Sequence, residues 1–378
     1  MNKATLKLKK SKRVDISLII PVILLAFFGT VMVYSAGYAY AYARYDDALY
    51  FVKKQSVWLF LGLSVMTVST KLNSDIFKKI SKPLYCITII LLLLVLIIGF
   101  VGNGAKRWIS IGPLTIQPSE IAKISLIMML ADYFSKQGER LLSKRRSDKF
   151  IYGTLIPILI MLLPILLVML QKHLSCIIIL SLIGVSMITV SGTDLRYISA
   201  FGVLGMAGIA SLALFTDYTK ERITVWQNPE AYKLTGGWQT LQGLMAIGSG
   251  GVFGVGFGKS VMKYSYVSEP ANDMIFAILC EELGLVGALI VLFLFLWLTA
   301  RGIRLSLRIE DTFKRLVGIG ICIKMAIQVL LNVAVVTNSI PNTGISLPFF
   351  SYGGSSLVML FFEMGMLISI TKEAVYQK

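Results

Sequence analysis

The 378-residue sequence has a single histidine, His173, and four cysteines. One histidine argues against a histidine-based metal site and against a catalytic triad that needs histidine as its base. The cysteines form no Cys-X-X-Cys pair, so we predict neither a disulfide framework nor a thiolate metal site. They all lie in apolar stretches, where we interpret them as small buried apolar residues: Cys86, Cys176, Cys280 and Cys322.

Charged residues are also scarce, at 15% of the sequence, whereas hydrophobic residues reach 56%. Soluble domains average about 25% charged residues. The apolar residues occur in long runs, and a helix that crosses the roughly 30 Å of bilayer hydrocarbon needs about 20 of them. The sequence therefore predicts an all-α polytopic membrane protein that forms a single integral membrane domain over residues 1–378.

We predict about ten transmembrane helices, which are placed by the apolar runs. The segments on the same side of the membrane as the N-terminus contain about twice as many Lys and Arg residues as the segments on the other side. Such an excess is typical of the cytoplasmic side. Both termini are therefore expected in the cytoplasm. The ten spans are 16–36, 55–70, 84–100, 118–135, 152–170, 174–190, 196–215, 274–299, 316–338 and 350–370.

The net charge of +17 would suggest nucleic acid as a partner of a soluble protein. In a membrane protein, basic loops instead face anionic membrane lipid on the cytoplasmic side. We therefore expect membrane lipid and no nucleic acid as a partner.

The long outer loop, residues 216–273, connects the seventh and eighth spans. Loops of this length are usually functional or disordered, and its apolar and aromatic residues favour an ordered loop. Residues 241–257 are apolar and rich in glycine, and we expect a helix or re-entrant segment that packs at the outer surface.

Charged residues in predicted spans are costly unless they are paired or solvated, so they are candidates for function. Glu120 and Lys123 are three residues apart and share a helix face. They form either a local ion pair or part of a polar site at the outer mouth, to which Lys106, Arg107 and Trp108 would contribute. An arginine beside a tryptophan suits a phosphate group with an apolar neighbour.

Asp273 lies where the outer loop meets the eighth span. It is either a helix N-cap or a carboxylate at the membrane boundary that acts as a general base, because partial desolvation would raise its pKa. Lys172 and His173 are expected in a solvated outer turn.

Deeper in the spans, Glu281 and Glu282 are expected to pair with Lys324, and Glu363 could join them. A transporter would use such residues differently, as a polar path across the membrane. A lipid flippase with Glu281, Lys324 and Glu363 on its path is therefore the alternative function, and a scaffold without catalytic activity is a third.

Several strings of residues, in order along most of the chain, resemble the SEDS family (shape, elongation, division, sporulation) of RodA, FtsW and SpoVE. They are Gly104-Ala105-Lys106-Arg107-Trp108-Ile109, Gln117-Pro118-Ser119-Glu120-Ile121-Ala122-Lys123, Gly237-Trp238-Gln239, Ile247-Gly248-Ser249-Gly250-Gly251, Glu269-Pro270-Ala271-Asn272-Asp273-Met274-Ile275-Phe276, Glu281-Glu282-Leu283-Gly284, Pro341-Asn342-Thr343-Gly344 and Leu347-Pro348-Phe349-Phe350-Ser351-Tyr352-Gly353-Gly354-Ser355-Ser356.

The resemblance implies a peptidoglycan glycosyltransferase of the cytoplasmic (inner) membrane that polymerises lipid II at the outer face. Its substrates would be lipid II and undecaprenyl-linked glycan, and its partner a class B penicillin-binding protein, a transpeptidase. The family's catalytic aspartate corresponds to Asp273, which would act as general base in an inverting transfer.

Family residues near the third and fourth spans correspond to Arg107, Trp108, Glu120 and Lys123. Arg107 and Lys123 would bind the leaving pyrophosphate, Glu120 would orient Lys123, and Trp108 would contact sugar or lipid. Gln239 is a candidate sugar ligand. A divalent cation, Mg²⁺ or Mn²⁺, could assist, although no cofactor or metal ligand is assigned.

One string departs from the family pattern. Many members carry Gln-Pro-Asp-Leu-Gly-Thr after the fifth span, where this chain has Gln171-Lys172-His173-Leu174-Ser175-Cys176. Any function of that aspartate is therefore carried out differently in this chain or is absent from it.

Overall fold

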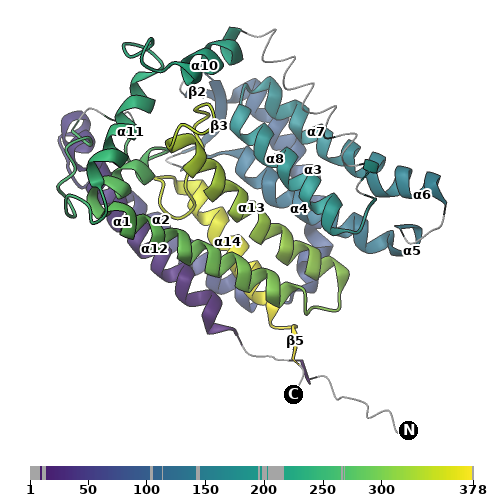
Figure 1. Cartoon of the computed structure of the whole chain (residues 1–378). Helices are drawn as coiled ribbons and strands as arrows, with labels where there is room; N and C mark the ends of the chain where they lie inside the picture. The colour runs from purple at the N-terminus through teal and green to yellow at the C-terminus, as the bar shows by residue number, and fades with distance from the viewer. Residues whose placement is uncertain are drawn as a thin grey trace.

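The computed structural model describes residues 9–10, 14–102, 105–112, 114–141, 145–194, 196–197, 202, 217–264, 267 and 269–376. Most of the long helices lie side by side in a bundle, with shorter helices at both ends (Figure 1). The helices are α1 (Ile16–Tyr45), α2 (Tyr50–Lys71), α3 (Asp75–Ile98), α4 (Pro118–Lys136), α5 (Gly138–Leu141), α6 (Arg146–Phe150), η1 (Ile151–Leu155), α7 (Ile156–Leu170), α8 (Leu174–Val190), α10 (Asp217–Gln227), α11 (Trp238–Gly250), α12 (Ile275–Ser306), α13 (Thr312–Val336) and α14 (Gly354–Thr371).

Within the described part of the chain, six helical segments are long and apolar enough to cross a membrane: α1, α3, the continuous segment Arg146–Leu170, α12, α13 and α14. The protein is therefore a multi-pass membrane protein. Helices also occupy the predicted spans at α2, α4 and α8, whereas the predicted span 196–215 lies almost entirely outside the described residues.

The first and last described strands pair with each other. Strand β1 (Lys9–Lys10) is antiparallel to β5 (Val375–Tyr376), and Figure 1 shows β5 at one end of the bundle. Helix α10 and strands β2 and β3 lie at the opposite end of the bundle (Figure 1).

A small antiparallel sheet between α3 and α4 is absent from the sequence-based prediction. Its strands are β2 (Phe100–Gly102), β3 (Ala105–Ile111) and β4 (Leu114–Ile116), in the order β2-β3-β4. The turn between β3 and β4 includes Gly112, whose φ of +61° is in the left-handed region that favours glycine. The apolar–polar alternation over residues 109–111 and 114–116, and the Gly-Pro turn between them, are the signals that could have predicted this hairpin.

Helix α12 is interrupted at Gly284, which has φ +66° and ψ −166°. Residues 251–256 compensate for the interruption: Val255 N donates to Glu281 O at 2.9 Å, and Leu285 N donates to Gly251 O at 3.0 Å. A Cβ on Gly284 would lie 2.4 Å from Gly254 N, so glycine is required at this close approach. Residues 251–256 therefore pack about two turns beyond the start of α12. Helix α11 covers most of the segment 241–257, for which a helix or re-entrant segment was predicted.

The cysteine interpretation holds for three of the four residues. Cys176, Cys280 and Cys322 are free and buried, whereas Cys86 is free but exposed on α3. An exposed apolar position on a membrane helix faces lipid, so Cys86 was wrongly predicted to be buried.

Candidate active site

A cavity of about 640 Å³ opens near the N-terminal end of α12. Residues from the β3–α4 region, the turn before α8, helices α10 and α11, the segment before α12 and the loop before α14 line it. Five of the predicted site residues meet there although they are far apart in the sequence: Arg107, Trp108, Glu120, Gln239 and Asp273. Lys106 and Lys123 do not line the cavity.

Asp273 is held at the cavity by its backbone. Asn332, on α13, donates its side-chain amide to Asp273 O at 2.9 Å and to Ile345 O at 2.6 Å. Helix α12 begins at Ile275 with Met274 as its N-cap residue, so Asp273 is not the N-cap. This leaves the carboxylate directed into the cavity, as the general-base interpretation requires.

The loop before α14 holds the segment that carries Asp273. Tyr352 N donates to Ala271 O at 2.8 Å, and Ser351 Oγ donates to Asn272 O at 2.7 Å. Gly344 has φ +70°, and a Cβ there would lie 3.5 Å from Asp273 Oδ2. The loop thus approaches the carboxylate closely without covering it.

The Asp273 carboxylate accepts a hydrogen bond from a side-chain amide and lies near a second acid. Gln239 Nε2 lies 3.3 Å from Asp273 Oδ1 and 3.4 Å from Oδ2, and Asn342 Nδ2 donates to Gln239 Oε1 at 3.1 Å. Burial and the nearby Glu269 carboxylate raise the pKa of Asp273 to about 6, against the opposing hydrogen bonds from the backbone and from Gln239. Such a carboxylate is ionised at neutral pH and is still basic enough to accept a proton.

Arg107 enters the cavity from β3 and is anchored on the turn before α8. Its Nη2 donates to Lys172 O at 2.6 Å. His173 follows this carbonyl and is 8% exposed, so the prediction of a solvated turn holds for the exposed Lys172 but is wrong for the histidine, which is buried and lines the cavity. Burial and the neighbouring Arg107 and Lys123 charges lower the pKa of His173 to about 3, which keeps it neutral.

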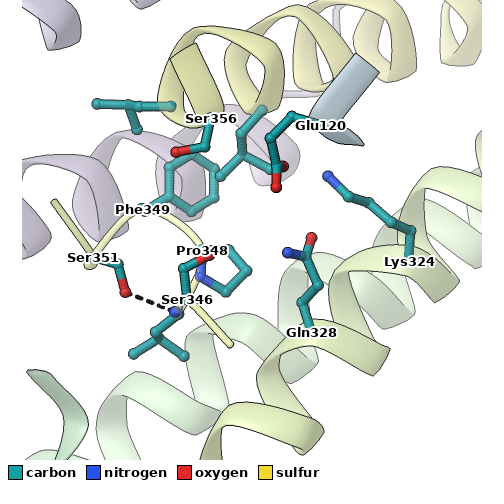
Figure 2. A pocket seen from close by; sticks show the side chains of 11 residues that line it. Glu120, Lys324, Gln328, Ser346, Pro348, Phe349, Ser351 and Ser356 are labelled. Atoms are coloured by element: carbon teal, nitrogen blue, oxygen red, sulfur yellow. Dashed lines mark hydrogen bonds between the residues drawn. The ribbon is translucent and has the colours of Figure 1, made fainter. Parts of the chain in front are cut away.

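Glu120 and Lys123 form the local ion pair that was one of the two predictions. Lys123 Nζ lies 2.7 Å from Glu120 Oε1, and both side chains are buried. Glu120 also borders a water-sized cavity of about 20 Å³, together with Lys324 and Gln328. Figure 2 shows these three side chains directed toward one another at this cavity.

The predicted pairing of Glu281 or Glu282 with Lys324 is wrong. Lys324 Nζ instead binds both carboxylate oxygens of Glu363, at 2.9 and 2.7 Å. Glu282 pairs with Lys263 at 2.9 Å, and Glu281 accepts from Val261 N at 2.9 Å. A similar depth in the membrane is compatible with the predicted pair. In the structure, residues 251–264 instead pack against α12 and supply the partners of both carboxylates.

Two charged residues of the cavity were not predicted. Arg222 on α10 and Glu269 before α12 both line it. Arg222 Nη1 donates to Asn342 O, which brings a second arginine to the site. Because both lie in the outer loop, no helical pattern in the sequence indicated which way they face.

The described residues contain no group of three or more His, Cys, Asp or Glu side chains that could hold a metal ion. The acidic side chains of the 640 Å³ cavity are Glu120, Glu269 and Asp273, and Glu120 is already paired with Lys123. These residues do not fit a metal site made by the protein alone.

Comparison with known proteins places the chain in a family. Residues 15–376 match the cell cycle protein family of FtsW, RodA and SpoVE. The chain belongs to this family. It is 39% identical to stage V sporulation protein E of Bacillus subtilis over 366 residues, which cover 96% of this chain and 98% of that protein. It is 35% identical to a probable peptidoglycan glycosyltransferase FtsW of Geobacter sulfurreducens, with 97% of each chain covered.

Two solved structures have the same fold. The crystal structure of the rod shape determining protein RodA of Thermus thermophilus superimposes with a TM-score of 0.70 at 28% identity, and covers 97% of this chain and 98% of that one. A chain from a peptidoglycan synthase complex, described for its coordination of polymerization and crosslinking, superimposes with a TM-score of 0.78 at 27% identity, with 95% and 97% covered.

Proposed function

We propose that this protein is a peptidoglycan glycosyltransferase that polymerises lipid II into glycan strands at the outer face of the cytoplasmic membrane. The observation that carries the proposal is the position of Asp273, a carboxylate of raised pKa, in one cavity with Arg107 and Arg222. A base and two cations are what a displacement of pyrophosphate by a sugar hydroxyl requires.

In the proposed step, the 4-hydroxyl oxygen of the acceptor GlcNAc attacks C1 of the donor MurNAc. The bond from C1 to the pyrophosphate oxygen breaks, the configuration at C1 inverts, and Asp273 takes the hydroxyl proton. Negative charge gathers on the leaving pyrophosphate, where Arg107 and Arg222 would stabilise it. Arginine suits this role because its guanidinium remains charged and can bind two oxygens at once.

The other predicted residues receive indirect or peripheral roles in this proposal. Lys123 lies against Glu120 and outside the cavity lining, so it would position Glu120 and would not bind pyrophosphate itself. Trp108 lines the cavity and would contact the sugar or the start of the lipid. Lys106 is exposed on β3 and would attract the anionic substrate from outside.

The proposed orientation has ten spans with both termini in the cytoplasm and the 640 Å³ cavity at the outer face of the cytoplasmic membrane. The pairing of β1 with β5 supports it, because it brings both ends of the chain to one side. The likeness to a chain of a peptidoglycan synthase complex supports a class B penicillin-binding protein as the partner that crosslinks the strands.

Purified protein in detergent with lipid II tests the proposal. Asp273→Asn should abolish glycan formation while the protein still purifies as a folded monodisperse species. Glu310→Gln is the matched control, because Glu310 is an exposed carboxylate between α12 and α13, outside the cavity. Normal polymerisation by Asp273→Asn would refute the base assignment.

The same assay separates this function from a flippase. Detergent micelles have no two compartments, so product formed there cannot depend on translocation. The flippase alternative would place Glu281, Lys324 and Glu363 on one polar path. In the structure they belong to two sites, because Lys324 pairs with Glu363 whereas Glu281 accepts hydrogen bonds from the segment 260–262. Transport of lipid II by proteoliposomes, without any glycan product, would favour the flippase.

A further inference from the structure

The N-terminal end of helix α8 opens on the 640 Å³ cavity. Helix α8 begins at Leu174, and its N-cap residue His173 lines the cavity without making a capping hydrogen bond to the helix. In the described part of the chain, neither Leu174 N nor Ser175 N donates to a backbone carbonyl. The first N–H groups of a helix carry a partial positive charge, and an anion is a favourable partner for them. This helix end is suited to an anion, and the residues around it decide whether a ligand binds there.

Two hydrogen bonds bring residues from distant parts of the chain to this helix end. Arg107 Nη2, from β3, donates to Lys172 O at 2.6 Å. Ser175 Oγ, in the first turn of α8, donates to the carbonyl of Thr343, in the loop before α14. Arg107, His173 and Thr343 all line the cavity. They therefore form one connected part of its wall.

Each of these three side chains has a buried polar atom without a hydrogen-bond partner among the described residues. The atoms are Arg107 Nε, His173 Nδ1 and Thr343 Oγ1. His173 is only 8% exposed, so bulk solvent does not replace the missing partner. Buried polar atoms in proteins are rarely unpaired, and those that are unpaired call for an explanation. Three of them on one cavity wall, beside a helix end without a cap, indicate a polar ligand that completes the site.

The charge around His173 selects the sign of that ligand. Arg107 and Lys123 act on the His173 ring as positive groups and Glu120 as a negative one, which leaves one net positive charge. Glu120 is paired with Lys123, whereas Arg107 donates to an uncharged carbonyl, so the charge of Arg107 is available to a ligand. His173 itself is neutral, because burial and the two positive groups lower its pKa to about 3. The wall therefore attracts an anion and has N–H donors to bind it.

A pyrophosphate is the anion that the proposed reaction produces in this cavity. Its oxygens accept several hydrogen bonds, which Arg107 and the N–H groups of α8 can donate. We propose that this wall, formed by the N-terminus of α8 with Arg107, His173 and Thr343, binds the leaving polyprenyl pyrophosphate, and that His173 determines how strongly it does so. The inference rests on the proposed glycosyltransferase function.

The strength of the site depends on what His173 does not provide. The string Gln-Pro-Asp-Leu-Gly-Thr, which many family members carry at residues 171–176, has aspartate at this N-cap position. Aspartate is a preferred N-cap residue that would bind the first N–H groups of α8, and its charge would offset that of Arg107. A neutral histidine without a capping bond leaves both to the ligand. We therefore expect this protein to hold the released pyrophosphate more tightly than an aspartate variant does.

Histidine NMR detects the site directly, because His173 is the only histidine in the chain. The protein, purified in detergent without a histidine tag, is titrated with farnesyl pyrophosphate, a polyprenyl pyrophosphate with a short chain. The ring signals of His173 should shift until the site is saturated. Farnesol has the same chain without phosphate groups and should leave the signals in place. No shift with farnesyl pyrophosphate, or an equal shift with farnesol, would overturn the site.

Two variants at this position separate charge from capping. His173→Asp should raise the Kd for farnesyl pyrophosphate in titration calorimetry by about tenfold. His173→Asn also caps α8 but adds no charge, so it should raise the Kd less. Both variants should unfold at the wild-type temperature or above it, because each gains a favourable cap. Weaker binding can then not be ascribed to misfolding.

Asn228→Asp is the control for an added carboxylate. Asn228 is exposed and does not line the cavity, and an aspartate there can still accept the hydrogen bond from Ala231 N. This variant should bind farnesyl pyrophosphate as the wild type does. If His173→Asp binds as tightly as the wild type, or Asn228→Asp as weakly as His173→Asp, the role given to His173 is wrong.

Turnover distinguishes the leaving group from the acceptor, which also carries a pyrophosphate. Negative charge grows on the leaving pyrophosphate in the transition state, so His173→Asp should lower kcat severalfold at saturating lipid II. Weaker binding of farnesyl pyrophosphate with an unchanged kcat would contradict the leaving-group assignment. The NMR and calorimetric results do not depend on glycan formation. A wild type that binds farnesyl pyrophosphate but makes no glycan would therefore refute the proposed function without removing the pyrophosphate site.

Discussion

The side-chain amide of Gln239 faces the Asp273 carboxylate, with its nitrogen 3.3 Å from one oxygen and 3.4 Å from the other. A hydrogen bond donated to a carboxylate stabilises its ionised form and lowers its pKa. In this site it opposes burial and the Glu269 charge, which raise the pKa of Asp273 to about 6. Gln239 thus helps to determine the pH at which the proposed base becomes available.

Replacing Gln239 with methionine should move the acidic limb of the activity profile to higher pH. Without the amide donor, the pKa of Asp273 rises further above its usual value, and the carboxylate is protonated at a pH where the wild type is still active. We expect a shift on the order of half a pH unit. The dependence of kcat/KM on pH measures it, and Gln227→Met, which removes an exposed amide at the end of α10, is the control. A limb that stays in place would show that Gln239 does not act on the base.

Replacing Glu269 with glutamine should have the opposite effect. The Glu269 carboxylate is the second cause of the raised pKa of Asp273, after burial. Removing its charge lowers the pKa, so the acidic limb moves to lower pH and the variant stays active in more acidic buffer than the wild type. Glu230→Gln, at an exposed position of the outer loop, should leave the limb where it is. Shifts of the same sign in the Gln239 and Glu269 variants would contradict this account of the base.

His173 is the only histidine in the chain, so an NMR experiment on histidine-labelled protein observes it without assignment. Burial and the positive charges of Arg107 and Lys123 lower its pKa to about 3. We expect no titration of its ring resonances between about pH 5 and 8, where an unperturbed histidine changes charge. Arg107→Met removes one positive neighbour and should raise the pKa of His173. A midpoint between about pH 6 and 7 in the wild type would show a solvated ring, as the sequence first suggested.

The membrane helices were predictable because lipid offers the backbone no hydrogen-bond partners. A segment in hydrocarbon must satisfy its own N–H and C=O groups, so each apolar run predicts a helix. The run 174–190 coincides with α8 at both ends. Asp273 was singled out through family resemblance and its place at the start of a span, and it lines the 640 Å³ cavity.

The contacts between distant side chains were not predictable in the same way. Lys324 is near Glu281, Glu282 and Glu363 in depth, and only the rotation and packing of the helices select Glu363 as its partner. The partner of Glu282 is Lys263, which lies in the outer loop and carries no helical pattern. His173 was expected in solvent because it lies in a turn. In the structure, Arg107 of β3 donates a hydrogen bond to the backbone of this turn and His173 is buried.

Breaking the ion pair between Lys263 and Glu282 should destabilise the fold strongly. Lys263 Nζ lies 2.9 Å from Glu282 Oε1, both side chains are buried, and Ser35 Oγ on α1 donates to the same carboxylate at 2.6 Å. The pair therefore joins the outer loop, α12 and α1 about 10 Å past the start of α12. Removing one partner leaves a buried charge without compensation, which typically costs about 3–5 kcal/mol.

We therefore expect Lys263→Met and Glu282→Met each to lower the thermal unfolding midpoint in detergent strongly, and the double variant to recover much of the loss, because no isolated charge remains. Lys53→Met is the matched control: Lys53 and Asp47 are also 2.9 Å apart, but their side chains are 62% and 37% exposed. A pair in solvent contributes about 0–1 kcal/mol, so this midpoint should barely change. If the decrease of the midpoint in the double variant equals the sum of the decreases in the single variants, the two side chains act independently. The pair then does not hold the loop on α12.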